Sequence, residues 1–279
     1  MTDGSVRVLG TDDLSEVIRV LGIRPLENVF VASRIRSGGI EPFTLGCEIW
    51  GYEVGGELRA VLHNGANLVP VNADDDALDA FAEALGPSRR CASIVGRADV
   101  AMGLWRRLCR IWPDAWDDPR EIRAHQPLMA ISGPPAVARD PRVRRVTMTD
   151  AATYFRAAVA MYTEEVGTTP LDGTNGYRRY VEHLIDQGRA MGIVDAGQVV
   201  FKSDVGSATS TTCQVAGVWL RPDLRGRGLS AAAMASVVEL CSEEWTTVTL
   251  YVNDFNTRAR ALYRRVGFDE IGELATVLY

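Results

Sequence analysis

One stretch of the sequence, from Cys213 to Ser236, limits what the chain can fold into more than any other. It opens with Val215–Leu220, an apolar run rich in β-branched and aromatic residues, which predicts a buried strand. Pro222 ends that strand, because a proline has no N–H for a ladder hydrogen bond. A basic glycine turn, Arg225 to Gly228, then leads into an alanine-rich helix. Strand, glycine turn and helix N-terminus therefore follow one another directly.

Such a turn is suited to bind an anion. Glycines let the backbone come close to a ligand and direct successive N–H groups outward. The dipole and unpaired N–H groups of the following helix favour a phosphate or pyrophosphate, and Arg225 and Arg227 add positive charge. No Gly-Lys-Ser/Thr follows, and the third glycine of a dinucleotide fingerprint is missing, which argues against both of those nucleotide sites. The turn alone leaves open an exposed basic loop without a ligand.

A second pattern follows the first at the expected distance for a neighbouring strand and helix. Thr246–Asn253 alternates apolar and polar residues as a half-buried strand does. Asn256 is placed to cap a helix that carries Tyr263 on its apolar face, and Gly267 suits a left-handed helix end. The pattern reads N-x-x-A-x-x-L-Y-x-x-x-G-F.

Together the two patterns resemble the signatures of the GNAT superfamily of N-acyltransferases. In the acyl-CoA-binding signature, Q/R-x-x-G-x-G/A, Arg225 fills the first position, Gly228 the fourth and Ser230 the sixth, where serine is a mild departure. The resemblance implies an α/β (α+β) fold, with a mixed, mostly antiparallel central sheet flanked by helices. It also implies that the fourth and fifth strands splay apart to admit pantetheine.

The cofactor that this resemblance implies is acetyl-CoA, as the acyl donor, with no metal. Backbone groups of Val218 and Leu220 would hydrogen-bond the pantetheine as an added strand would, and Asn256 would offer its amide to the pantetheine or pyrophosphate. The expected cofactor-binding residues are Val218, Trp219, Leu220, Arg225, Gly226, Arg227, Gly228, Leu229, Ser230 and Asn256.

The expected catalytic residues are Tyr263 and Gln214. Tyr263 would donate a proton or a hydrogen bond to the departing thiolate. The strand Thr211–Leu220 carries no glutamate as a base, and Gln214 can only hold a water. The base is left open between a water relay, Glu165 and Asp204. The acceptor would be a small-molecule, peptide or protein amine, with specificity set by residues 162–180, where Glu164 and Glu165 can attract a cation.

The first half of the chain echoes the order of elements in the second half, which predicts an internal duplication. At the counterpart of the glycine turn, Asn72–Asp76 has no glycine and three carboxylates, which would repel a pyrophosphate. Trp105 stands where the second half has Tyr263, and an indole is not a usable general acid. The first half is therefore expected to be a degenerate GNAT-like domain with a structural or acceptor-shaping role.

The predicted domains are residues 1–131 and 143–279, joined by a proline-rich linker at 132–142. The expected helices of the first half include one over 26–36 with Pro25 at its first position. The second domain is expected to open with a strand over 143–148 and to close with a strand that begins at Phe268. Between these lie predicted helices over 151–166, 177–187 and 229–242, and strands over 189–195, 199–205 and 211–220.

Composition excludes several classes of function. The net charge of -6 over 279 residues argues against general nucleic-acid binding, and no polybasic run suggests a membrane surface. Five cysteines without close pairing predict free thiols, and three histidines without ligand-like spacing argue against a metal site. The polar N-terminus and the lack of a long apolar run predict a cytoplasmic protein. A homodimer is possible.

The function predicted from the sequence is an acetyl-CoA-dependent N-acetyltransferase whose C-terminal domain is active. Two alternatives remain open at this level. The first is a non-catalytic acyl-CoA-binding sensor, since no base is evident. The second is a tandem enzyme similar to mycothiol synthase, which only the duplication supports.

Overall fold

The computed structural model describes residues 4–279, which divide into two compact units. The first unit contains residues 4–128, Tyr251–Phe255 and Ile271–Tyr279, and the second contains Met129–Leu250 and Asn256–Glu270. The predicted domains are each continuous in sequence, whereas both units collect separate segments. The two halves of the chain are therefore interleaved near their ends.

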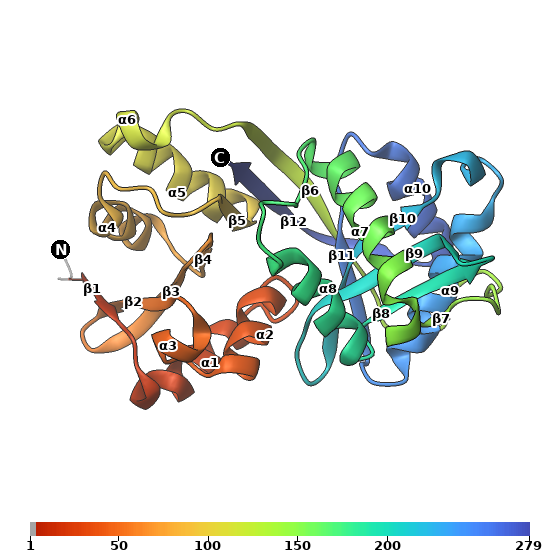
Figure 1. Cartoon of the computed structure of the whole chain (residues 1–279). Coiled ribbons are helices and arrows are strands. Elements are labelled where there is room, and N and C mark those ends of the chain that lie inside the picture. The colour runs from red at the N-terminus through yellow and green to blue at the C-terminus, as the bar shows by residue number, and fades with distance from the viewer. Residues whose placement is uncertain (1–3) are drawn as a thin grey trace. The chain divides into compact units, whose positions relative to one another are not determined.

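The first unit is a sheet with helices on both faces (Figure 1). One face is covered by α1–α3 and the other by α4–α6, and each face has its own apolar core. Leu62 lies in one core and Val61 in the other, as the alternation of side chains along a strand requires. The elements are β1 (Gly4–Val8), α1 (Leu14–Gly22), α2 (Val29–Gly38), α3 (Pro42–Leu45), β2 (Glu48–Val54), β3 (Glu57–Asn64), β4 (Asn67–Val71), α4 (Asp75–Leu85), β5 (Ser93–Arg97), α5 (Ala98–Ile111), α6 (Pro113–Trp116) and β6 (Glu121–Ile131), of which β6 continues into the second unit.

The last strand of the chain, β12 (Asp269–Leu278), completes the sheet of the first unit. Leu274–Leu278 pairs antiparallel with Ser93–Arg97 of β5. Ala275 and Val277 are fully buried in the core beneath α4 and α5. The hydroxyl of Tyr279 donates to the carbonyl of Trp116 at 3.0 Å. The predicted final strand exists, but its partner lies in the first half of the sequence.

The second unit repeats the same order of elements. Figure 1 shows α7 and α8 on one side of its strands, where they enclose an apolar core around Tyr154 and Phe155. The helices α9 and α10 pack against each other. The elements are β7 (Arg144–Arg145), α7 (Ala151–Val166), α8 (Gly176–Asp186), β8 (Ala190–Asp195), β9 (Gln198–Ala208), β10 (Thr212–Leu220), α9 (Leu229–Ser242), β11 (Thr247–Tyr251) and α10 (Thr257–Val266).

The predicted fold class is confirmed. Strands β1–β4 and β7–β10 each form an antiparallel series, and in each half a helix then leads to a parallel strand, β4 to β5 and β10 to β11. Both halves therefore have the same order of antiparallel and parallel strand pairs, as expected for an internal duplication.

Two local predictions are wrong at their ends. Pro25 does not begin a helix, because residues 24–28 form a turn and α2 starts at Val29. The side-chain amide of Asn28 there donates to the carbonyl of Leu21 at 3.0 Å, which stabilises the turn. The strand predicted over 143–148 is reduced to Arg144–Arg145, because residues 148–150 form a 3₁₀ turn before α7.

The segment predicted as a linker lies along the helices of the second unit. The amide of Ala136 donates to the carbonyl of Val266 at 2.7 Å, and the amide of Asp140 donates to the carbonyl of Ala232 at 3.0 Å. The hydroxyl of Ser236 in turn donates to the carbonyl of Asp140. These contacts tie residues 136–140 to α9 and to the end of α10, so the segment is part of the second unit.

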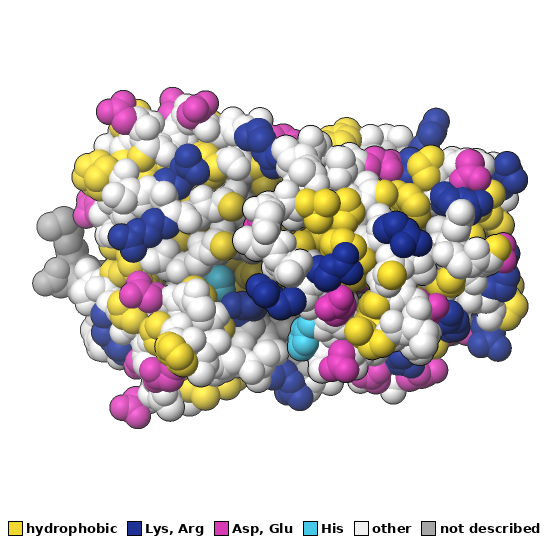
Figure 2. Space-filling view, viewed as in Figure 1, with side chains coloured by type: hydrophobic (Ala, Val, Ile, Leu, Met, Phe, Trp, Pro, Cys, Tyr) yellow, Lys and Arg dark blue, Asp and Glu magenta, His cyan; other side chains and the backbone are white. Residues whose placement is uncertain are grey.

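The surface carries mixed charge, with basic and acidic side chains interspersed over the face in view in Figure 2. Within residues 4–279, none of the helices combines the length and apolar character that crossing a bilayer requires.

Candidate active site

The predicted site begins where two parallel strands of the second unit part. The register between β10 and β11 covers three pairs, from Thr212–Thr247 to Gln214–Thr249. Beyond Gln214, β10 continues through Val218 to Leu220 and pairs with β9 on its other side. This arrangement fits the predicted splay, since the second half of β10 lies beyond the last pair that β10 forms with β11.

The glycine turn adopts the backbone conformation that its sequence indicates. Gly226 and Gly228 both have φ of +77°, in the left-handed region. A Cβ atom on either would meet nothing within 4 Å, so backbone strain, rather than lack of space, is what selects glycine at both positions. Residues Arg225–Gly228 are exposed, which leaves the turn accessible to a ligand.

The helix that follows the turn lacks a side-chain cap. Gly228 is the N-cap of α9 and has no side chain that could accept from the first-turn N–H groups. At the counterpart in the first unit, Asp74 caps α4, its carboxylate accepting from the amide of Ala77 at 3.0 Å. The carboxylate of Asp74 thus occupies one N–H of α4 and places a negative charge at its N-terminus, whereas the N-cap of α9 does neither.

Arg225 is held by an ion pair. Its two terminal nitrogens lie 2.6 and 2.8 Å from the carboxylate oxygens of Glu164 on α7, and its Nε donates to the carbonyl of Leu220 at 3.0 Å. The indole N–H of Trp219 donates to the same carboxylate at 3.2 Å. The guanidinium holds the pKa of Glu164 below its usual range, with the Trp219 hydrogen bond adding to the effect. Arg225 thus braces the turn against α7, and the charge of Glu164 is already compensated.

Tyr263 is buried on α10, with 7% of its surface exposed. Its ring packs edge-on against Phe268, with the centroids 5.9 Å apart. Burial, together with the nearby charge of Glu165, raises the pKa of the hydroxyl above its ordinary value. A protonated hydroxyl on a largely buried side chain is suited to donate to a bound group.

Asn256 begins α10 as predicted. Its side-chain oxygen accepts from the amide of Ala259 at 3.1 Å, which is the geometry of an N-cap. With the oxygen engaged, the NH₂ group of the same amide is the part that can reach a ligand.

The three groups considered as a base differ sharply in their surroundings. Gln214 is 8% exposed and belongs to the last pair that β10 forms with β11. Asp204 is buried on β9 and accepts from Lys202 and from the hydroxyl of Tyr154 at 2.7 Å. Both of its oxygens are thus engaged by protein donors. Glu165 lies close enough to Tyr263 to raise the pKa of its hydroxyl.

Sequence reasoning missed Lys202, Tyr154 and the role of Glu164 as the partner of Arg225. A signal for the first was present, because Lys202 is the only lysine of the chain and lies two residues before Asp204 in the predicted strand Val199–Val205. Residues two apart on a strand share a face, so opposite charges at this spacing in a buried strand predict an ion pair. The pairing of Glu164 with Arg225 had no local signal, since 61 residues separate the two.

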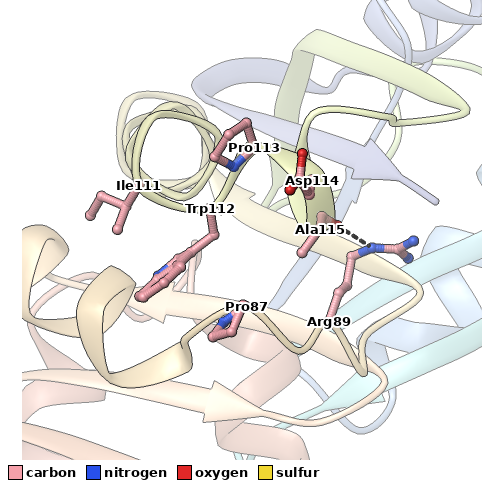
Figure 3. Close-up of a pocket in the computed structure, with 7 residues that line it drawn as sticks. All are labelled: Pro87, Arg89, Ile111, Trp112, Pro113, Asp114 and Ala115. Atoms are coloured by element: carbon pink, nitrogen blue, oxygen red, sulfur yellow. Dashed lines mark hydrogen bonds between the residues drawn. The ribbon is translucent and has the colours of Figure 1, made fainter.

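A separate cavity of about 460 Å³ lies in the first unit (Figure 3). Figure 3 shows Arg89 reaching past Ala115, whose carbonyl accepts from Arg89 Nε at 3.0 Å. The lining residues are Pro87, Arg89, Ile111, Trp112, Pro113, Asp114 and Ala115. None of the predicted site residues is among them. Over residues 4–279, no group of three or more His, Cys, Asp or Glu side chains is arranged to hold a metal ion.

Two protein families match the sequence in succession. Residues 47–154 match a domain of unknown function (DUF4081), and residues 145–268 match the acetyltransferase (GNAT) family. The second match contains the glycine turn, Asn256 and Tyr263. No curated protein matches the sequence significantly.

Solved structures match the fold over nearly the whole chain. A GNAT-family acetyltransferase from Colwellia psychrerythraea is 10% identical, with a TM-score of 0.58 and 99% of both chains covered. A GCN5-related N-acetyltransferase from Sphaerobacter thermophilus is 18% identical, with a TM-score of 0.58 and coverage of 99% and 95%. A tandem GNAT protein from the clavulanic acid biosynthesis pathway is 14% identical, with a TM-score of 0.54 and coverage of 99% and 98%. At these identities the likeness establishes the fold.

The family match and the fold agree with the local geometry of the second unit. The predicted resemblance is confirmed: residues 145–268 match the acetyltransferase (GNAT) family, and the fold of the chain is similar to that of solved GNAT proteins.

Proposed function

We propose that the second unit transfers an acetyl group from acetyl-CoA to an amine, and that the first unit binds no acyl-CoA. The observation that carries this proposal is the uncapped N-terminus of α9 behind the left-handed glycines Gly226 and Gly228. It lies directly after a strand whose pairing with β11 ends at Gln214. The pyrophosphate would occupy the turn, with Arg227 adding charge, and the pantetheine would follow β10 past Val218.

The reaction is direct transfer. The amine nitrogen attacks the thioester carbonyl carbon, the nitrogen loses a proton to water, the C–S bond breaks, and the sulfur leaves as a thiolate that takes up a proton. Tyr263 would supply that proton or a hydrogen bond, because burial raises the pKa of its hydroxyl and keeps it protonated at neutral pH. The thiolate is a weak base, with a pKa of about 8.5 by analogy with cysteine, so a single donor is sufficient.

The acceptor would be a primary amine of a small molecule or a peptide. An ammonium with a pKa of about 10.4 needs about 4–5 kcal/mol to lose its proton at pH 7. Glu165 is the carboxylate best placed to attract such a cation, since its charge acts on Tyr263 and on Tyr177 of α8. A water relay past Gln214 would complete the deprotonation.

Replacing Tyr263 with phenylalanine is expected to lower kcat about 10²-fold while the Kd for acetyl-CoA stays within about threefold. The ring and its packing on Phe268 remain, so only the proton donor is lost. CoA release in a thiol assay measures kcat, and calorimetry measures the Kd for acetyl-CoA. Tyr52→Phe, at a buried tyrosine of the first unit, is the matched control and should leave both unchanged. A Tyr263→Phe variant with the kcat of the wild type would remove this residue from the mechanism.

The pH dependence follows from the raised pKa of Tyr263. Because burial and Glu165 raise that pKa, the hydroxyl stays protonated through pH 10. Deprotonation of the acceptor amine should then make kcat/KM rise between pH 7 and 9, by up to about tenfold per unit, without a falling limb below pH 10. A falling limb below pH 10 that disappears in Tyr263→Phe would contradict this assignment.

CoA release from acetyl-CoA across a panel of polyamines, amino sugars, aminoacyl compounds and peptides tests the proposed function. Transfer to at least one class of amine, well above hydrolysis, is expected. Tight binding of acetyl-CoA without transfer to any amine offered would instead support an acyl-CoA sensor.

A further inference from the structure

Lys202 is buried in the middle of the second unit. Its side chain is 0% exposed, although a buried ammonium is costly unless it is paired and hydrogen-bonded. The ammonium lies 2.5 Å from a carboxylate oxygen of Asp204 and donates to the carbonyl of Gly217 at 3.0 Å. Apart from its three histidines, the other basic residues of the chain are all arginine. This position therefore calls for the compact ammonium of lysine rather than a planar guanidinium.

Tyr154 of α7 completes the network. Its hydroxyl donates to the second carboxylate oxygen of Asp204 at 2.7 Å, and its ring centroid lies 5.3 Å from the ammonium of Lys202. Tyr154 itself is fully buried. Ammonium, carboxylate and phenol thus connect α7, β9 and β10 through fully engaged polar groups.

The network acts on an irregular part of β10. The register with β9 shifts between Ala216 and Trp219, where β10 contains one residue more than its partner. Gly217 lies in this bulge with φ of +58°, and a Cβ there would come within 2.8 Å of both Asp204 and Lys202. A side chain at position 217 would therefore collide with the ion pair.

The carbonyl of Gly217 determines where the next N–H points. A trans peptide is planar, with its C=O and N–H on opposite sides, so the amide of Val218 is directed away from Lys202. Val218 lies beyond the last pair of β10 with β11, on the stretch where the proposed function places the pantetheine and thioester. The orientation of this one amide is set by a buried side chain of the neighbouring strand.

We propose that Lys202, held by Asp204 and Tyr154, is a positioning residue that fixes the Gly217–Val218 peptide so that the Val218 amide faces the acyl thioester carbonyl. This inference rests on the proposed function. It assigns a role to the one lysine of the chain, and it explains why Asp204 is engaged rather than available as a base. A donor fixed before the substrate arrives stabilises the oxyanion that develops during transfer.

Paired substitution tests the proposal without leaving a lone buried charge. In Lys202→Met/Asp204→Asn both charges are removed together, and the hydroxyl of Tyr154 can still donate to the new amide. We expect kcat to fall 10- to 100-fold with the Kd for CoA within threefold, because the pyrophosphate turn is untouched. Tyr154→Phe should give a smaller loss of the same kind. A folded double variant with kcat within twofold of the wild type would overturn the proposal.

Ser203→Ala is the matched control. Ser203 lies between the two exchanged residues on β9, is fully buried, and its hydroxyl has no hydrogen-bond partner among residues 4–279. We expect this variant to keep the kcat of the wild type and a thermal midpoint at least as high. If Ser203→Ala loses kcat as strongly as the double variant, the effect belongs to strand packing and the proposal fails.

The single lysine also permits a direct observation in the wild-type chain. Labelling with [¹³Cε,¹⁵Nζ]lysine gives one side-chain signal, because no other lysine exists. The thioester carbonyl of acetyl-CoA would engage the Val218 amide. Saturating acetyl-CoA should therefore shift this signal at least twice as far as CoA, which lacks the thioester carbonyl. Equal shifts, or none, would overturn the proposal. Absence of transfer to every amine would refute the proposed function alone, since the lysine signal needs binding and not turnover.

Discussion

Replacing Gly228 with aspartate is expected to raise the Kd for acetyl-CoA by more than 100-fold. Gly228 has φ of +77° at the N-cap of α9, a conformation that strains a residue with a Cβ. The new carboxylate would also accept from the first-turn N–H groups of α9 and place a negative charge where the pyrophosphate should bind. Isothermal titration calorimetry with acetyl-CoA measures the loss.

Gly197→Asp is the matched control for this variant. Gly197 lies in the turn between β8 and β9 of the same unit and has φ of +74°, and a Cβ added there would also meet nothing within 4 Å. The backbone strain in Gly197→Asp is therefore similar to that in Gly228→Asp, but Gly197 lies outside the proposed anion site. Gly197→Asp should bind acetyl-CoA within about twofold of the wild type. Equal losses in both variants would show that strain, and not the anion site, is responsible.

Removing Ile271–Tyr279 is expected to unfold the first unit, although these residues lie at the opposite end of the sequence. The deletion leaves β5 without the partner that pairs with Ser93–Arg97, and it removes the buried side chains of Leu274 and Val277. Each such side chain contributes about 1.5–3 kcal/mol, in a unit whose total stability is on the order of 5–15 kcal/mol. Hydrogen exchange in α4 and α5, which pack on the same core, is the readout.

A pair of point variants on β12 separates this effect from truncation itself. Val277→Asp places a carboxylate in the core and should lower the free energy of unfolding by at least about 3 kcal/mol. Ile271→Asp, at a position of the same strand that is 42% exposed, should change it by less than about 0.5 kcal/mol. Protection of α4 and α5 that survives Val277→Asp would contradict the placement of β12.

Local signals were sufficient to predict most elements, including the strand, turn and helix that carry the candidate site. The strand, turn and helix around Gly228 follow from residues next to one another, and Asn256 caps its helix as its position indicates. The contrast between the two helix N-termini was also predictable, because the carboxylates of Asn72–Asp76 are visible in the sequence and Asp74 caps α4.

Features set by distant partners were not predictable. The alternation of Asp269–Leu278 is the same whichever sheet receives the strand, so its pairing with β5 has no local signal. Likewise the ion pair of Arg225 with Glu164 joins residues 61 apart in the sequence and has no local signal. Asp204 looked like a candidate base because its partners, Lys202 and Tyr154, are brought together only by folding.

The central claim is that the chain binds one acyl-CoA, at the uncapped helix of its second unit, and not two. Calorimetric titration of the wild-type chain with acetyl-CoA tests this most directly. The expected stoichiometry is about one site per chain, because the carboxylate of Asp74 caps α4 and would repel an anion there, whereas α9 begins at a glycine. Binding should be lost in Gly228→Asp and retained in Asp74→Asn. Two sites per chain, or binding that survives Gly228→Asp and disappears in Asp74→Asn, would contradict the account.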